Sequence, residues 1–123
     1  MISGRVTADR EAIIPLEILG SDLQHRHLDV ILDTGFNGAL TLPSPIVRDL
    51  ELPFLSTRRA TLADGSTVAL EMYLAVVVWH EQEREVPVLQ AEGDVLIGMA
   101  LIEGSHVTLD VIEGGDVIIE PLG

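Results

Sequence analysis

Asp33, Thr34 and Gly35 form the tripeptide of this sequence whose residue types and order suggest catalytic chemistry. The carboxylate directly follows three apolar residues at 30–32, so it is expected at the end of a buried strand. Because burial disfavours a charged carboxylate, this group needs hydrogen-bond donors around it. Gly35 permits close approach of the backbone, and the Thr34 hydroxyl can organise the loop. The alternative interpretation is an ordinary turn in which Asp-Thr-Gly caps the strand end.

Mostly β structure is expected around this tripeptide, because apolar and β-branched runs alternate with glycine-bearing turns. A turn is expected at 20–22, and Asp64-Gly65 is a strong hairpin signal. The sequence predicts strands at 13–19, 23–32, 39–42, 54–62, 67–79, 84–89, 95–98, 107–112 and 117–120.

One or two short helices complete this pattern. Ser44, as N-cap, and Pro45, in the first turn, predict a helix over 46–50. Residues 99–103 can form one helical turn that Gly104 closes. The expected fold class is therefore all-β, predominantly β with one or two short helices.

The composition excludes several other kinds of chemistry. The 123 residues include 20 acidic and 7 basic side chains, for a net charge of −13, and no cysteine. All the basic residues are arginine. Lysine Schiff bases, P-loop lysines, thiol nucleophiles, disulfides and thiolate metal sites are therefore excluded. The acidity argues against nucleic acid as a partner.

Length and hydrophobic patterning favour one soluble domain over residues 1–123. No apolar run approaches the ~20 residues that cross a bilayer, so no membrane association is expected. The first residues carry no signal-peptide pattern, which predicts a cytoplasmic location.

Several motifs in a fixed order make the chain resemble a known family. The apolar triplet before Asp33 is followed by the hairpin tip at Asp64-Gly65 and by Leu96-Ile97-Gly98. In this order they resemble the retropepsin-like aspartic proteases, the single-lobe group that includes retroviral proteases and bacterial relatives. The resemblance covers nearly the whole chain. It implies a closed-barrel-like acid protease lobe and aspartic endopeptidase activity on peptide or protein substrates, without cofactor or metal.

The resemblance also implies roles for individual residues. Asp33 would be the catalytic carboxylate, Thr34 would hold two loops together across a dimer axis, and Gly35 would offer backbone to the substrate. Where many relatives carry an Arg, Asn or Asp within two positions of the glycine at 98, this chain has Met99 and Ala100. The implied substrate-binding residues are Asn37, where many relatives carry an acidic residue, and the flap tip of Ala63, Asp64, Gly65 and Ser66.

Catalysis by this route needs a second copy of the chain. Aspartic hydrolysis uses two carboxylates that share one proton, and the sequence holds one Asp-Thr-Gly. A C2 homodimer would bring two Asp33 residues together, although its charge of −26 (2 × −13) opposes association. The apolar tail at 117–122 is expected either to pair across the axis or to complete the sheet of its own chain. The alternative function is a non-catalytic peptide-binding or dimerisation module with the same lobe.

Other constellations carry less chemistry. His25 and His27 would share one face of a strand, but no further ligands are evident, so a solvated surface is preferred to a metal site. His80 stands alone and is expected at or near the surface. Ser105 and His106 would point to opposite faces of a strand, which argues against a serine hydrolase.

Overall fold

A computed structural model describes residues 1–21 and 24–123. Asp22, in the expected turn, and Leu23, in the expected strand 23–32, lie outside the described residues. The elements are β1 (Ile2–Val6), β2 (Ala12–Leu19), β3 (His25–Leu32), β4 (Leu40–Leu42), α1 (Ser44–Asp49), β5 (Phe54–Thr61), β6 (Thr67–Trp79), β7 (Gln82–Gln90), β8 (Leu96–Ile97), α2 (Met99–Ile102), β9 (Ser105–Leu109) and β10 (Asp116–Pro121).

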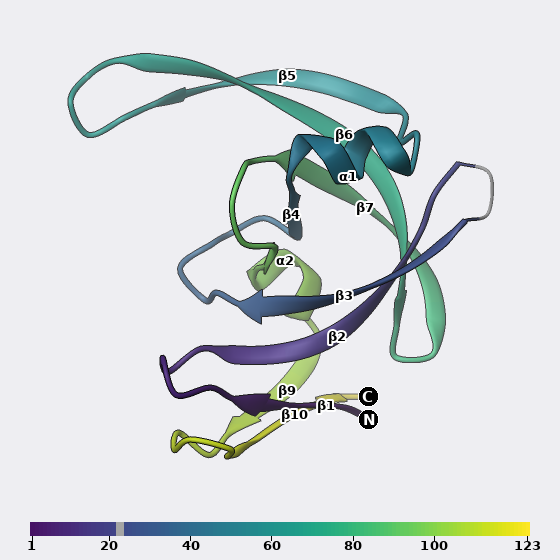
Figure 1. Cartoon of the computed structure of the whole chain (residues 1–123), viewed down its shortest axis with the longest axis vertical. Coiled ribbons are helices and arrows are strands. Elements are labelled where there is room, and N and C mark those ends of the chain that lie inside the picture. Colours follow the sequence, from purple (N-terminus) through teal and green to yellow (C-terminus); the bar gives the residue numbers. More distant parts are fainter. Residues whose placement is uncertain (22–23) are drawn as a thin grey trace.

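Within the described residues, the ten strands form a single sheet in the order β5-β6-β7-β4-β8-β3-β2-β1-β10-β9. Neighbouring strands are antiparallel except for β3 with β8 and β4 with β7, which are parallel. β2 also pairs with β6, so the sheet folds back on itself without forming a regular barrel (Figure 1). The mostly β architecture with two short helices, expected from the sequence, is confirmed.

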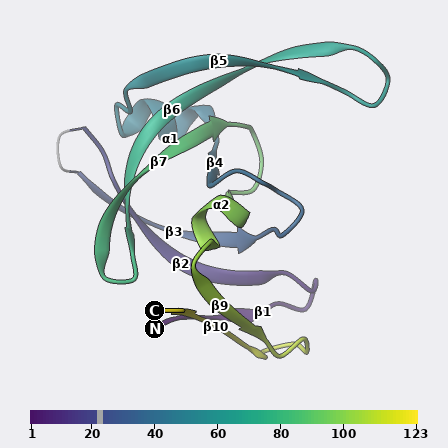
Figure 2. The same ribbon diagram turned by 180° about the vertical axis from the view of Figure 1, so that it is seen from behind.

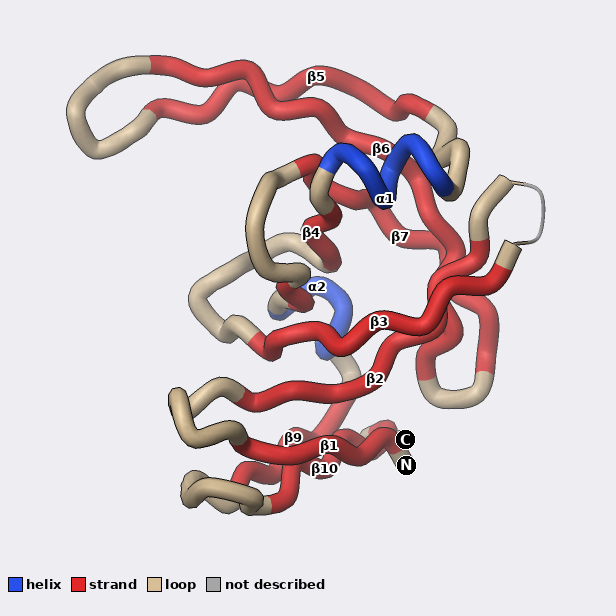
Figure 3. Tube along the Cα trace, in the orientation of Figure 1, coloured by secondary structure: helices blue, strands red, loops and turns tan. Residues whose placement is uncertain are grey.

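The core lies between the folded halves of this sheet, and α1 and α2 pack on it (Figure 3). Its centre is aliphatic: Leu40, Val88, Ile97 and Leu101 are fully buried. They come from β4, β7, β8 and α2, so the core directly supports the short strands beside the Asp33 loop. Burial of aliphatic side chains is the main stabilising contribution in such a domain.

The hairpin of β5 and β6 extends away from this core. At the far end of β6, Ala75, Val77 and Trp79 are buried at alternate positions, as in a strand with one face on the core. Between 67 and 71 no residue is buried, because only β5 pairs with β6 there. The hairpin therefore projects over the body as an arm, as Figures 1 and 2 show from opposite sides.

Four local predictions differ from the structure. The strand predicted at 107–112 is β9, Ser105–Leu109, and residues 110–112 lie in the turn before β10. β1 was not predicted, although Ile2, Gly4 and Val6 alternate with polar residues. β7 begins at Gln82, since the preceding turn is a tight one in which His80 and Glu81 both adopt positive φ angles. Ser44 lies inside α1 rather than at its cap. Pro43 is the N-cap residue, and the Ser44 N–H donates to the Glu92 carboxylate at 3.0 Å.

The C-terminal tail is part of the sheet of its own chain. β10 pairs with β1 on one side, Ile119 opposite Ile2, and with β9 on the other, Ile119 opposite Val107. Val117 and Ile119 are fully buried. Both edges of the strand are occupied, so of the two arrangements expected from the sequence the structure shows the second, in which the tail completes the sheet of its own chain. Deletion of residues 117–123 would remove core side chains and open the sheet.

Among the described residues, no helix is long and apolar enough to span a membrane.

Candidate active site

The Asp33 carboxylate lies at the end of β3, where this strand meets β8. Leu32 pairs with Ile97 in the parallel ladder, and the Asp33 N–H donates to the Ile97 carbonyl at 2.9 Å. The side chain then turns back, and its Oδ1 accepts the Gly35 N–H at 2.9 Å. Asp33 is half-buried, so one oxygen is held by the loop while the carboxylate stays accessible from outside.

Thr34 and Gly35 form the exposed turn beyond this carboxylate. A Cβ on Gly35 would lie 3.2 Å from Asp33 Oδ1, a tight contact, so glycine allows the N–H to approach the carboxylate closely. The Thr34 hydroxyl makes no hydrogen bond within the described part of the chain. It is therefore available for a contact outside this chain.

The loop after Gly35 is fixed by backbone hydrogen bonds to α2. The Met99 N–H donates to the Phe36 carbonyl at 2.8 Å, and the Ala100 N–H donates to the Gly38 carbonyl at 3.1 Å. A Cβ on Gly98 would lie 2.4 Å from each of those two carbonyl oxygens. Glycine at 98 is thus required for α2 to lie against the loop. The side chains of Met99 and Ala100 cannot donate hydrogen bonds to the loop, and their backbone N–H groups do so instead.

Arg84 of β7 holds the other end of α2. Its Nη1 and Nη2 donate to the carbonyls of Leu101 and Ala100, each at 3.1 Å. These carbonyls lack partners inside so short a helix, and a cation is favourable at a helix C-terminus. This contact was missed from the sequence, because Arg84 lies 15 or more residues from α2 and reads as part of a charged surface strand.

The hairpin tip at residues 63–66 is shaped by an Asp-Gly turn. Gly65 has a φ of +87°, which favours glycine. Asp64 Oδ1 accepts the Ser66 hydroxyl at 2.6 Å and the Ser66 N–H at 2.9 Å. These two hydrogen bonds hold the pKa of Asp64 below its ordinary value. The tip is exposed and lies at the end of the arm.

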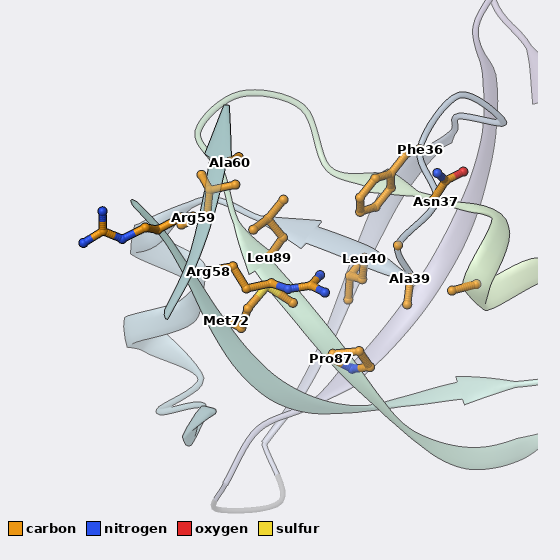
Figure 4. A pocket seen from close by; sticks show the side chains of 13 residues that line it. Phe36, Asn37, Ala39, Leu40, Arg58, Arg59, Ala60, Met72, Pro87 and Leu89 are labelled. Atoms are coloured by element: carbon orange, nitrogen blue, oxygen red, sulfur yellow. The ribbon is translucent and has the colours of Figure 1, made fainter. Parts of the chain in front are cut away.

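A pocket of about 410 Å³ separates the arm from the Asp33 loop. Asn37 and Leu40 line it from the loop after Asp33 and from β4, and Arg58 and Met72 line it from β5 and β6 (Figure 4). Leu70 of β6 also lines it. Asn37 is thus among the residues that line a cavity. The tip residues at 63–66 do not line this pocket. The hairpin lines it instead with residues 58–60 of β5 and with Leu70 and Met72 of β6, which are called the shaft of the hairpin here. The sequence showed no signal for the shaft, because its residues read as an ordinary alternating strand.

The histidines fall into two groups. His25 and His27 are exposed on β3, and His25 Nδ1 lies 3.4 Å from a Glu17 oxygen. Within the described residues, no group of three or more His, Asp or Glu is placed to hold a metal ion. His80 Nε2 lies 2.8 Å from Ser105 Oγ, and burial, with a smaller effect of nearby positive charge, lowers the pKa of His80. Ser105 thus faces His80 and not its neighbour His106.

Comparison with known proteins identifies the fold. No protein-family model matches the chain, and no curated protein matches it in sequence. Among solved structures, the chain is similar to a retropepsin-like aspartic protease from Rickettsia conorii, with a TM-score of 0.59 and 13% identity. The match covers 97% of this chain and 90% of that one. At this identity the similarity shows the fold alone: the chain has a retropepsin-like fold, as the motifs predicted.

Proposed function

We propose that this protein is an aspartic endopeptidase that works as a homodimer with one Asp33 from each protomer. The observation that carries the proposal is the Asp33 carboxylate at the end of a core strand, with one oxygen held by Gly35 and a pocket between its loop and a projecting hairpin. The retropepsin-like fold and its aspartic protease neighbour support it.

The chemistry follows from two carboxyl groups that share one proton. The ionised Asp33 takes a proton from a water molecule, whose oxygen attacks the peptide carbonyl carbon. The protonated Asp33 gives its proton to the carbonyl oxygen, which forms a tetrahedral diol. Collapse of the diol breaks the C–N bond, while a proton passes to the leaving nitrogen. Each chain has one Asp-Thr-Gly, so the second carboxyl must come from a second copy.

The dimer face of this proposal is the end of the sheet that carries Asp33. Across the adjacent strands β3, β2, β1 and β10, Ile31 pairs with Ile13, Ile13 with Arg5, and Arg5 with Asp116. Asp33 and the turn before β10 therefore lie at the same end of the sheet. Figure 3 shows the corresponding loops along one side of the molecule. In this turn, Val111 and Ile112 are 64% and 70% exposed.

Val111 and Ile112, rather than the C-terminal tail, can provide the apolar contact between protomers. β9, the neighbouring strand, is an edge strand of the sheet. A two-fold axis past Asp33 would bring two copies of the turn and of this edge toward each other. Apolar burial there would offset the repulsion between two chains of charge −13.

An extended peptide fits the space between the hairpin and the Asp33 loop. The hairpin consists of strands, and a bound peptide can add strand-like hydrogen bonds to it and to the loop. Alternate side chains of an extended peptide point to opposite sides, so every second one can enter the pocket. The flap tip at 63–66 would close over the substrate and exclude water.

Replacement of Asp33 by the isosteric asparagine tests this function. Asp33→Asn should lower kcat/KM on a peptide mixture by at least about 100-fold, because one acid–base group is lost from each protomer. Asp29→Asn is the matched control, since Asp29 is exposed on the same strand. Sedimentation should show the same dimer for the wild type, Asp33→Asn and Asp29→Asn.

Full activity of Asp33→Asn would exclude the proposed role of this carboxylate. A dimer that neither cleaves peptides nor binds a peptide containing statine, which mimics the tetrahedral intermediate, would favour a non-catalytic module.

A further inference from the structure

Arg58 places a positive charge on the wall of the pocket between the hairpin and the Asp33 loop. It lies on β5 opposite Leu70 of β6, on the face of the hairpin that is turned toward the body. Arg59 also borders the pocket, but in Figure 4 the guanidinium of Arg58 is directed toward Leu40 and that of Arg59 is directed away from it. This difference follows from strand geometry, since successive side chains point to opposite faces.

The walls of this pocket are mostly apolar, and Asn37 and Arg59 are the polar residues that line it besides Arg58. Leu40, Leu70, Met72, Pro87 and Leu89 line the pocket, and no Asp or Glu is among its lining residues. Arg58 forms no hydrogen bond or ion pair with any residue that the structure describes. An unpaired cation is therefore held over an apolar pocket in a chain whose net charge is −13.

We infer that Arg58 selects peptides that carry an acidic side chain, Asp or Glu, at the position that enters this pocket. The inference rests on the proposed function for the idea that a peptide binds here, and it adds the substrate class. A guanidinium presents a planar fork of donors that matches a carboxylate with two parallel hydrogen bonds. The aliphatic stem of a glutamate would lie on Leu40 and Met72, while its carboxylate reaches the guanidinium.

Burial by the substrate is what gives this contact its strength. In the free protein Arg58 is exposed and hydrated, so it needs no partner within the chain. A bound peptide would cover the pocket, remove water from the guanidinium and leave it unpaired if the entering side chain were neutral. A neutral side chain therefore loses the ion pair and also leaves a desolvated charge.

The selectivity is local and not a consequence of the overall charge. A dimer of charge −26 (2 × −13) repels an acidic peptide at long range. The preference is therefore measured as a ratio between Glu and Gln peptides of equal length at one salt concentration. This ratio does not depend on the fraction of folded protein.

Two measurements with acetylated, amidated octapeptides test the inference. Each pair of peptides has an apolar sequence and differs only by Glu or Gln at one position. Binding is measured with the uncleaving Asp33→Asn dimer by fluorescence anisotropy, and cleavage with the wild-type dimer. At one position, Glu should be preferred about 10- to 100-fold in both measurements. Arg58→Met should abolish this preference, Arg58→Lys should keep part of it, and Arg59→Met should keep all of it.

The outcomes separate this inference from the proposed function. Equal or undetectable binding of Glu and Gln peptides at every position would overturn the inference, and so would a preference that survives in Arg58→Met. Selective binding by Asp33→Asn, without cleavage by the wild-type dimer, would support the role of Arg58 and refute the peptidase.

Discussion

Substitution of Gly98 by alanine tests how the Asp33 loop is held in place. The new Cβ would lie 2.4 Å from the carbonyl oxygens of Phe36 and Gly38, where ordinary contact begins at 3.4 Å. Each contact must therefore lengthen by about 1 Å (3.4 − 2.4) before the alanine fits. Both oxygens belong to the backbone of the loop that follows Asp33, so the change acts on the candidate site itself.

The expected cost of Gly98→Ala has three parts. The two oxygens accept the N–H groups of Met99 and Ala100 at 2.8 and 3.1 Å, and loss of both hydrogen bonds costs about 1–3 kcal/mol. Overpacking adds about 1–3 kcal/mol. Alanine returns about 0.4–1 kcal/mol by restricting the unfolded chain, since the φ of −124° suits it. The free energy of unfolding should fall by about 3 kcal/mol, a large part of the roughly 5–15 kcal/mol of a typical domain.

Urea unfolding at one fixed protein concentration measures this loss, because the stability of a dimer depends on concentration. Gly123→Ala is the matched control, since its added Cβ would meet no heavy atom within 4 Å. The control should stay within about 0.5 kcal/mol of the wild type. An equally small effect of Gly98→Ala would refute the close packing of α2 on the Asp33 loop.

Three further predictions test the supports of the site and the dimer face. Burial lowers the pKa of His80, so below about pH 6.5 the unfolded chain takes up a proton at this residue more readily than the folded chain. The unfolding free energy of the wild type should therefore decrease as the pH falls, by at most about 1.4 kcal/mol per pH unit from this residue. His80→Asn should remove this contribution and make the unfolding free energy depend less on pH. An unchanged pH profile of urea unfolding would contradict this. Arg84→Met should cost about 1–3 kcal/mol in the same assay, because it removes two donors to α2, whereas Arg59→Met should be nearly neutral. Replacing both Val111 and Ile112 with serine should weaken dimerisation by at least about 100-fold in sedimentation equilibrium, and an unchanged dissociation constant would exclude this turn as the interface.

Local patterns in the sequence predicted most of the strands and the identity of the fold. β6 was predicted with the bounds that it has, because its apolar alternation is long and the Asp-Gly turn marks its start. The retropepsin-like fold was predicted from short motifs around Asp33, Gly65 and Gly98, each of which serves a turn or a close approach of the backbone. Such constraints act over a few residues, so they remain visible in a sequence that matches no curated protein.

Features that depend on distant contacts were missed. β1 is short and is stabilised by its pairing with β10, more than 100 residues away, so its own sequence is a weak signal. The same pairing places the C-terminal tail in the sheet of its own chain, whereas the sequence alone also allowed it to pair across a dimer axis. Arg84 and Arg58 read alike as surface arginines, and only the folded chain places one on α2 and the other over a pocket. The catalytic roles of residues 33–35, the homodimer and the cytoplasmic location stay predictions.

The distance between the two Asp33 carboxylates is the most direct test of the proposed enzyme. A crystal structure of the protein with a bound statine peptide measures it. The proposal predicts a C2 dimer in which the nearest oxygens of the two Asp33 side chains lie within about 3 Å, close enough to share a proton. The statine hydroxyl should lie between them. A dimer that keeps the two carboxylates apart, or a chain that binds the peptide as a monomer, would contradict the proposal.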